Sequence, residues 1–104
     1  FSSHVDFVES RPYRVWFFIK YIEKYVGTFY IQRNNSIGIS LNKEHYKNGI
    51  LETLKYINKN FIPGEAIKSI IPGHFYINLP YQDKSFQEVL TKSGYNPIQV
   101  SYKI

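Results

Sequence analysis

The sequence predicts a single α+β domain in which a mostly antiparallel sheet carries two to three helices packed on one face. Two adjoining patterns predict this class. Apolar and polar residues alternate on both sides of an Asn-Asn pair at 34–35, which indicates a β-hairpin, and apolar residues then recur at steps of three and four, which indicates an amphipathic helix. A chain of 104 residues with a 43% apolar share can build one core, so residues 1–104 are expected to form one domain.

The first quarter of the chain predicts a short edge strand over His4–Val8 and then a helix. Ser10 can cap that helix, Pro12 lies in its first turn, and Gly27 can stop it after Tyr25. Its apolar positions recur at helical spacing, at Val15, Phe18, Ile19, Ile22, Tyr25 and Val26.

The alternative for this segment is a strand from Tyr13 to Ile19, because the run is rich in β-forming residues. The helix is preferred because it places the charged residues at 20, 23 and 24 on one solvated face. It also directs Trp16 toward its polar side, where an exposed tryptophan anchors interfaces, whereas a shifted helical phase would put Trp16 in the core.

The hairpin is expected to comprise strands over residues 28–33 and 36–41, joined by a two-residue turn at Asn34-Asn35, since asparagine tolerates positive φ. Gly38 lies centrally in the second strand, where it either allows a close backbone approach or marks a bulge. The face expected to be buried consists of Phe29, Ile31, Ile37, Ile39 and Leu41.

The second half of the chain predicts a lysine-rich helix, two strands, a short helix and a last strand. Asn42 is the expected cap of the first helix, and Pro63-Gly64 follows it. The strands are expected over 66–71 and 74–79, the short helix from Asp83 or Ser85 to Ser93, and the last strand over 97–104. The expected buried stripe of the lysine-rich helix is Tyr46, Ile50, Leu54, Ile57 and Phe61, and the apolar residues of the last strand are Ile98, Val100, Tyr102 and Ile104.

The sheet face opposite the helices is expected to carry amides, hydroxyls, rings and lysines, and no carboxylate. Its expected members are Thr28, Tyr30, Gln32, Ser36, Ser40, Lys68, His74, Tyr76, Asn78, Gln99, Ser101 and Lys103. The chain carries 13 Lys and Arg against 8 Asp and Glu, a net charge of +5, which favours a polyanionic partner.

These observations predict a non-catalytic nucleic-acid-binding domain, with RNA and DNA both possible and a larger protein or ribonucleoprotein assembly as a further partner. Lysine and arginine contact phosphates, amides reach base edges, and tyrosine rings stack on unpaired bases. The residues predicted to bind nucleic acid are Tyr30, Gln32, Arg33, Lys68, Tyr76, Asn78 and Lys103.

A second interpretation is a protein-binding module, such as an inhibitor, an immunity protein or a small subunit, that uses an aromatic patch around Tyr13 and Trp16. Catalysis is a third: His74 near Tyr76 and Lys68 could act as a general acid or base on RNA. No metal, cofactor or other catalytic residue is predicted, because Gly-rich phosphate loops, a nucleophile elbow and paired-histidine zinc motifs are absent from the sequence.

The absence of cysteine excludes disulfides, thiolate catalysis and cysteine-based zinc sites, and it is compatible with an intracellular or organellar location. Methionine is also absent, so Phe1 is not a translational start and a processed chain or fragment is expected. No apolar run is long enough to cross a bilayer, so no membrane partner is expected.

The expected order of elements over residues 11–94, α-β-β-α-β-β-α, resembles the half-domain of LAGLIDADG homing endonucleases and maturases. Residues 26–32 look like the end of that family's signature helix running into its first DNA-reading strand, and residues 37–41 look like the next segment. The resemblance implies that the outer sheet face lies on nucleic acid. Because Lys24-Tyr25-Val26 lacks the family's metal-binding carboxylate, it also implies a cleavage-dead, maturase-like or ribosome-associated protein.

Overall fold

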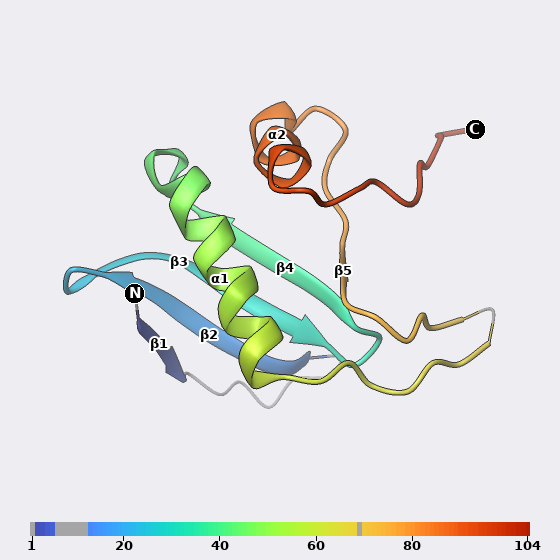
Figure 1. Cartoon of the computed structure of the whole chain (residues 1–104), viewed down its shortest axis with the longest axis horizontal. Helices are drawn as coiled ribbons and strands as arrows, with labels where there is room; N and C mark the ends of the chain where they lie inside the picture. Colours follow the sequence, from blue (N-terminus) through green and yellow to red (C-terminus); the bar gives the residue numbers. More distant parts are fainter. Residues whose placement is uncertain (1, 6–12, 69) are drawn as a thin grey trace.

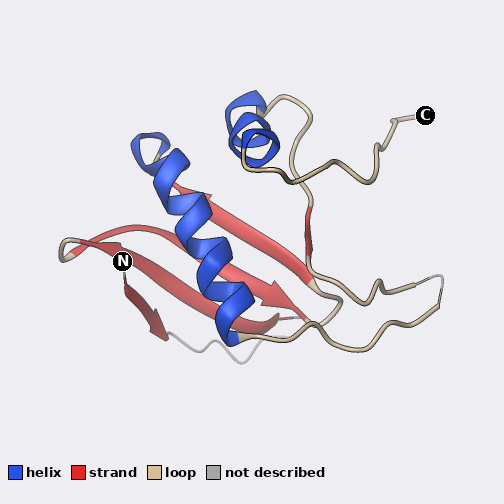
Figure 2. Cartoon of the chain, in the orientation of Figure 1, coloured by secondary structure: helices blue, strands red, loops and turns tan. Residues whose placement is uncertain are grey.

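A five-stranded sheet with helices on one side forms the fold, so the α+β class predicted from the sequence is confirmed (Figures 1 and 2). The computed structural model describes residues 2–5, 13–68 and 70–104. The sheet order is β1-β2-β3-β4-β5, with antiparallel pairs throughout except for a parallel β4–β5 pair. The strands are β1 (Ser2–Val5), β2 (Tyr13–Tyr21), β3 (Lys24–Gln32), β4 (Ser36–Leu41) and β5 (Tyr76–Ile77).

The helices cover the inner face of the sheet. A short 3₁₀ turn, η1 (Lys43–His45), leads into α1 (Tyr46–Asn60), and α2 (Lys84–Lys92) packs beside α1. Phe86 of α2 packs in the same hydrophobic core as the buried residues of α1 and the strands. The buried core consists of Phe17, Ile19, Val26, Phe29, Ile31, Ile37, Ile50, Leu54, Ile57 and Phe86.

The β3–β4 hairpin forms with the predicted faces. Phe29 pairs with Ile39 and Ile31 with Ile37 on the helix side, whereas Tyr30 pairs with Gly38 on the opposite side. The connection is longer than predicted, since residues 33–35 all lie between the strands. Only its last residue, Asn35, has positive φ (73°), and its backbone N–H donates to the carbonyl of Gln32 at 3.0 Å.

The predicted helix through Tyr25 is wrong, and the alternative strand over Tyr13–Ile19 lies within the observed β2. Gly27 does not end a helix but lies within β3, where a Cβ atom would be 2.0 Å from the Ser40 carbonyl oxygen. Two register shifts, between Tyr13 and Val15 and between Ile19 and Lys20, interrupt the alternation of these strands. The helix-like spacing has another origin: Val15 and Ile19 lie on the helix side of the sheet, Phe18 and Tyr25 on the opposite side, and Ile22 in the turn between β2 and β3.

The predicted strands outside this hairpin are mostly absent or shorter. In place of the strand predicted over 66–71, the described residues show an isolated bridge between Ile67 and Ile71, and β5 is limited to two residues. Residues 97–104 form no strand, because no sheet edge lies beside them, and their side chains are exposed. The predicted His4–Val8 strand is observed in part as β1, whereas residues 6–8 lie outside the described part of the chain.

The lysine-rich helix and the short helix are confirmed. In α1 the residues Ile50, Leu54 and Ile57 are buried as expected, although Asn42 makes no side-chain cap hydrogen bond. Asp83 caps α2, where its carboxylate accepts a hydrogen bond from the Phe86 backbone N–H at 3.2 Å. Gly94 follows α2 with φ of +93°, as its predicted role as a stop requires.

Candidate functional site

Three aromatic rings meet on the outer face of the sheet, the face away from α1. The register shift in β2 directs Tyr13 and Trp16 to the same side, beside Tyr30 of β3. The ring centroids of Tyr13 lie 5.1 Å from Trp16 and 4.9 Å from Tyr30, and those of Trp16 and Tyr30 lie 6.3 Å apart. These three half-buried residues, called the aromatic cluster below, are arranged edge to face or tilted, as aromatic pairs prefer.

The bulge that forms the aromatic cluster also gives Arg14 a structural role. Its guanidinium Nη1 donates to the Ile62 carbonyl at 2.7 Å, and its Cζ lies 5.7 Å from the centroid of the Phe61 ring. Arg14 therefore ties the start of β2 to the segment that leaves α1. It is not available to the outer face.

Gly38 makes room for the aromatic cluster. A Cβ atom on Gly38 would lie 2.1 Å from Cζ of Tyr30, so any larger residue would displace the ring. Neither role expected for this glycine is observed: the nearest atoms belong to a side chain and not to backbone, and the β3–β4 register has no shift at Gly38. Because Gly38 has no side chain, the Tyr30 ring can lie beside it and next to Trp16.

The rest of the outer face is polar or aromatic and has little charge. Phe18 and Tyr25 form a second ring pair with centroids 5.3 Å apart, and the Lys20 ammonium lies 5.6 Å from the Tyr25 centroid. Among the outward positions of β2 to β5, no residue is Asp or Glu. This outer face consists of Tyr13, Trp16, Phe18, Lys20, Tyr25, Thr28, Tyr30, Gln32, Ser36, Gly38, Ser40 and Tyr76.

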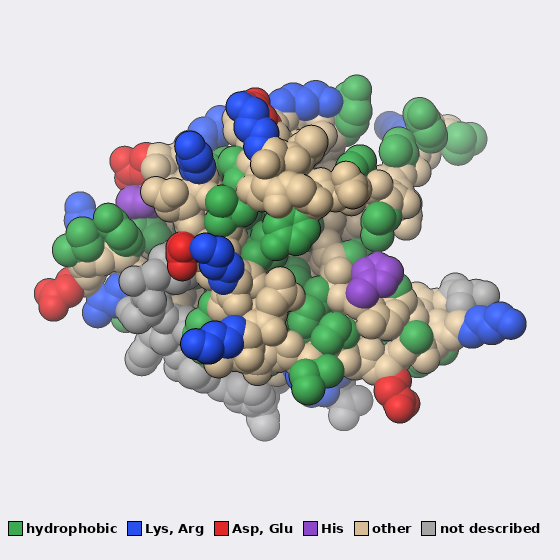
Figure 3. All heavy atoms as spheres, in the orientation of Figure 1, with side chains coloured by type: hydrophobic (Ala, Val, Ile, Leu, Met, Phe, Trp, Pro, Cys, Tyr) green, Lys and Arg blue, Asp and Glu red, His purple; other side chains and the backbone are tan. Residues whose placement is uncertain are grey.

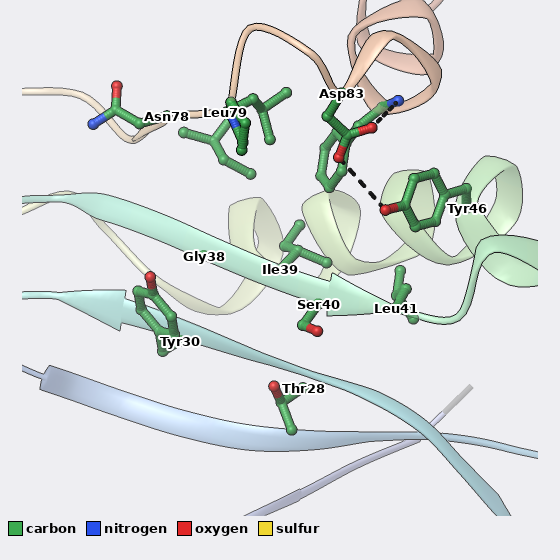
Figure 4. Close-up of a pocket in the computed structure, with 13 residues that line it drawn as sticks. Thr28, Tyr30, Gly38, Ile39, Ser40, Leu41, Tyr46, Asn78, Leu79 and Asp83 are labelled. Atoms are coloured by element: carbon green, nitrogen blue, oxygen red, sulfur yellow. Dashed lines mark hydrogen bonds between the residues drawn. The ribbon is translucent and has the colours of Figure 1, made fainter.

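Two hollows are lined in part by residues of β4. One, of about 310 Å³, is lined on the outer face by Phe18, Tyr25, Thr28, Ser40 and Asn42 among others. The other, of about 280 Å³, lies between β4 and the segment 77–83 (Figure 4).

Asp83 and Tyr46 both line the second hollow and point toward each other (Figure 4). The Tyr46 hydroxyl donates to the second carboxylate oxygen of Asp83 over 3.5 Å, which links α1 to the cap of α2. Burial, and then the Asp83 carboxylate, raise the pKa of Tyr46 above its ordinary value.

The structure brings some of the predicted nucleic-acid-binding residues together and separates others. Tyr30, Gln32 and Tyr76 lie on the outer face; Arg33 is exposed in the turn after β3, and Asn78 follows β5. The expected placement of the two lysines on the sheet is wrong. Lys68 lies in the turn closed by Ile67 and Ile71, and Lys103 lies in the segment after α2, because neither segment forms a strand of the sheet.

Tyr13 and Trp16, expected to form a separate protein interface, instead share a surface with Tyr30. The only signal of this arrangement in the sequence is the β-rich run of residues 13–19. The bulge that aligns Tyr13 with Trp16 depends on Arg14, whose partners are 47 and 48 residues later in the chain. Such a distant contact has no local pattern in the sequence.

His74, the residue of the catalytic interpretation, lies in the segment before β5. It is exposed, and its ring centroid lies 6.5 Å from that of Tyr76. Across residues 2–5, 13–68 and 70–104, no group of three or more His, Cys, Asp or Glu side chains could hold a metal ion. In the same part of the chain, no helix has the length and apolarity to cross a bilayer.

Comparisons with protein-family models, with curated proteins and with solved structures find no match for this chain.

Proposed function

We propose that the outer face of this sheet binds single-stranded nucleic acid, and that the aromatic cluster provides the stacking surface. The observation that carries the proposal is the meeting of Tyr13, Trp16 and Tyr30 on a sheet face that the helices leave uncovered. Stacking of a base on an aromatic ring is worth about 1–3 kcal/mol and tolerates any base.

The surroundings of the cluster suit an unpaired strand. Gln32 and Ser36 offer hydrogen-bonding groups to base edges, while Lys20 and Arg33 offer positive charge at two ends of the face. A negatively charged backbone meets no carboxylate on the outward positions of β2 to β5. The hollow beside Phe18 and Tyr25 gives an unstacked base a second place to lie.

The resemblance to LAGLIDADG proteins, which stays a prediction, implies nucleic-acid binding on the same face. The residues that it assigns to the end of a helix, Val26 and Gly27, belong to β3. The proposal therefore rests on the aromatic cluster and not on that family.

Alanine substitutions test the proposal. Tyr30→Ala removes a central ring and should raise the dissociation constant for a labelled single-stranded oligonucleotide by about tenfold, the effect of losing one stacked base. Tyr81→Ala is the matched control, because Tyr81 is exposed in the segment before α2, outside the outer face. Circular dichroism verifies that both variants fold. Equal affinities for the two variants would contradict the proposal.

A second candidate function is the binding of a protein partner on the same surface. The low charge of the outer face favours it, since the aromatic cluster has the tryptophan and tyrosine anchors of protein interfaces. The two functions differ in the oligonucleotide test. A protein-binding face would give no saturable binding to oligonucleotides at low salt, whereas the proposed function requires it.

A further inference from the structure

Residues 97–104 have the pattern of a β-strand but no sheet to join. Apolar side chains alternate with Gln99 and Ser101 along this segment. Ile98 is 72% exposed, Val100 67% and Tyr102 83%. In Figure 1 the segment leaves α2 and runs away from the sheet. An alternating segment of this kind normally buries one side against a core, so its apolar side lacks a partner here.

Within the described residues, part of the β4 edge of the sheet has no partner strand. β5 pairs only with Ser36 and Ile37, and the Tyr76 N–H donates to the Asn35 carbonyl at 3.2 Å. Backbone groups of alternate residues point to the same edge, so Ile39 and Leu41 present their N–H and C=O groups beyond the end of β5. Within the described residues, no backbone hydrogen bond reaches these groups from outside the β3–β4 ladder.

The hollow of about 280 Å³ runs along this unpaired part of β4 (Figure 4). On its helix side it is lined by the apolar Leu79 and Phe86 and by the hydrogen-bonded Tyr46 and Asp83, whereas Ser40 lines it on the outer face. A strand added at this edge would turn one side toward Leu79 and Phe86 and the other toward the polar outer face. Residues 98–102 have one apolar and one polar side.

We propose that residues 97–104 of a second copy of this chain pair with the free β4 edge, and that the two copies exchange these segments reciprocally. Each chain supplies one such segment and one such stretch of the β4 edge, so a two-fold dimer pairs both segments with both edges. Main-chain hydrogen bonds to Ile39 and Leu41 hold the added strand, and its apolar side chains face Leu79 and Phe86.

The exchange would also place polar residues of the added strand beside Ser40, on the outer face. This inference does not depend on nucleic-acid binding, because it rests on the edge and the free segment alone. Oligonucleotide affinity and assembly are separate measurements, so the failure of one is distinguishable from the failure of the other.

Disulfide crosslinking tests the exchange directly, because the chain contains no cysteine. A Ser40→Cys variant is mixed with a Ser101→Cys or a Gln99→Cys variant and oxidised mildly. Facing positions on adjacent strands lie within disulfide reach, so a covalent heterodimer is expected in at least one mixture. The control replaces Ser40→Cys with Glu52→Cys, an exposed position on α1. A heterodimer yield no greater than the control would overturn the proposal.

Sedimentation velocity over a concentration series provides the second measurement. The unmodified chain should form a dimer, and Val100→Lys should raise its dissociation constant at least tenfold because the charge would enter the apolar side of the added strand. Gln99→Lys adds the same charge on the polar side and should leave the dimer intact. A chain that stays monomeric at every concentration, or equal effects of the two lysine variants, would overturn the proposal.

Discussion

Asn35 connects more of the structure than any of its neighbours in the hairpin turn. Its side-chain amide donates to the carbonyls of Gly64 (3.0 Å) and Pro72 (2.7 Å), and its side-chain oxygen accepts from the Gly64 N–H at 2.7 Å. Its backbone carbonyl accepts from Tyr76. The residue is 1% exposed, so these groups have no access to water. Asn35 therefore holds the loop after α1 and the start of β5 against the hairpin.

Substitutions at Asn35 should separate its side-chain bonds from its backbone conformation. Asn35→Gly keeps the positive φ and loses the three side-chain bonds, which should lower the free energy of unfolding by roughly 2–3 kcal/mol. Asn35→Ala should lose about 1 kcal/mol more, because alanine is strained at positive φ. Urea denaturation measures both. Asn48→Ala, at an exposed position of α1, should change stability little. Equal stability of the Asn35 variants and the control would show that Asn35 holds nothing in place.

At the scale of elements, the sequence predicts α1, α2 and the β3–β4 hairpin because each depends on local signals. The cap at Asp83 and the three- and four-residue spacing of Ile50, Leu54 and Ile57 lie within their own helices. The β2–β3 hairpin has no such signal. Its turn residues, Ile22 and Glu23, both have positive φ (45° and 61°), a conformation that β-branched residues rarely adopt.

The same difference between local and distant signals explains how much of the candidate site could be predicted from the sequence. Tyr30 and Gln32 were predictable from the alternation of β3, whereas their contact with Tyr13 requires the bulge at Arg14. The predicted strand at residues 97–104 has the right pattern, but a pattern cannot supply a neighbouring edge. Sheet pairing between distant segments is the part of this fold that local sequence does not encode.

The link between α1 and α2 predicts a stability change at alkaline pH. The pKa of Tyr46 is raised in the folded state. The contribution of its protonated hydroxyl to the free energy of unfolding is therefore complete below the ordinary tyrosine pKa, near 10, and is lost as the pH rises through the folded pKa. Tyr46→Phe should cost about 0.5 kcal/mol at pH 7, since a 3.5 Å hydrogen bond is weak. Its stability should then fall less than that of the unmodified chain between pH 9 and 11, about one unit either side of that pKa. Parallel pH profiles from thermal unfolding would contradict this.

At the scale of the whole molecule, positive charge is not concentrated on the outer face. Figure 3 shows the helix side, where Lys and Arg side chains are scattered among other residues. On the outer face the sole cation of the described strands is Lys20, and Arg33 lies in the adjoining turn. The radius of gyration of 14.0 Å exceeds the roughly 13 Å typical of this size, in keeping with the exposed segment after α2.

This charge distribution predicts a shallow salt dependence of oligonucleotide binding. Two phosphate contacts, by Lys20 and Arg33, correspond to a slope of about −1.4 for the logarithm of the association constant against the logarithm of salt concentration. Replacing both residues with glutamine should bring the slope close to zero. A steep slope that survives this double substitution would place the phosphate contacts on the lysines of α1 and not on the outer face.

The most direct test of the proposed function uses Trp16, the single tryptophan of the chain and a member of the aromatic cluster. Its fluorescence is recorded while a single-stranded oligonucleotide is added at low salt. Bases stacking on the cluster should quench this emission in a saturable titration, with a midpoint that matches the affinity measured from a label on the oligonucleotide. Binding reported by the label with unchanged Trp16 emission, or no binding at all, would contradict the assignment of the outer face as the nucleic-acid interface.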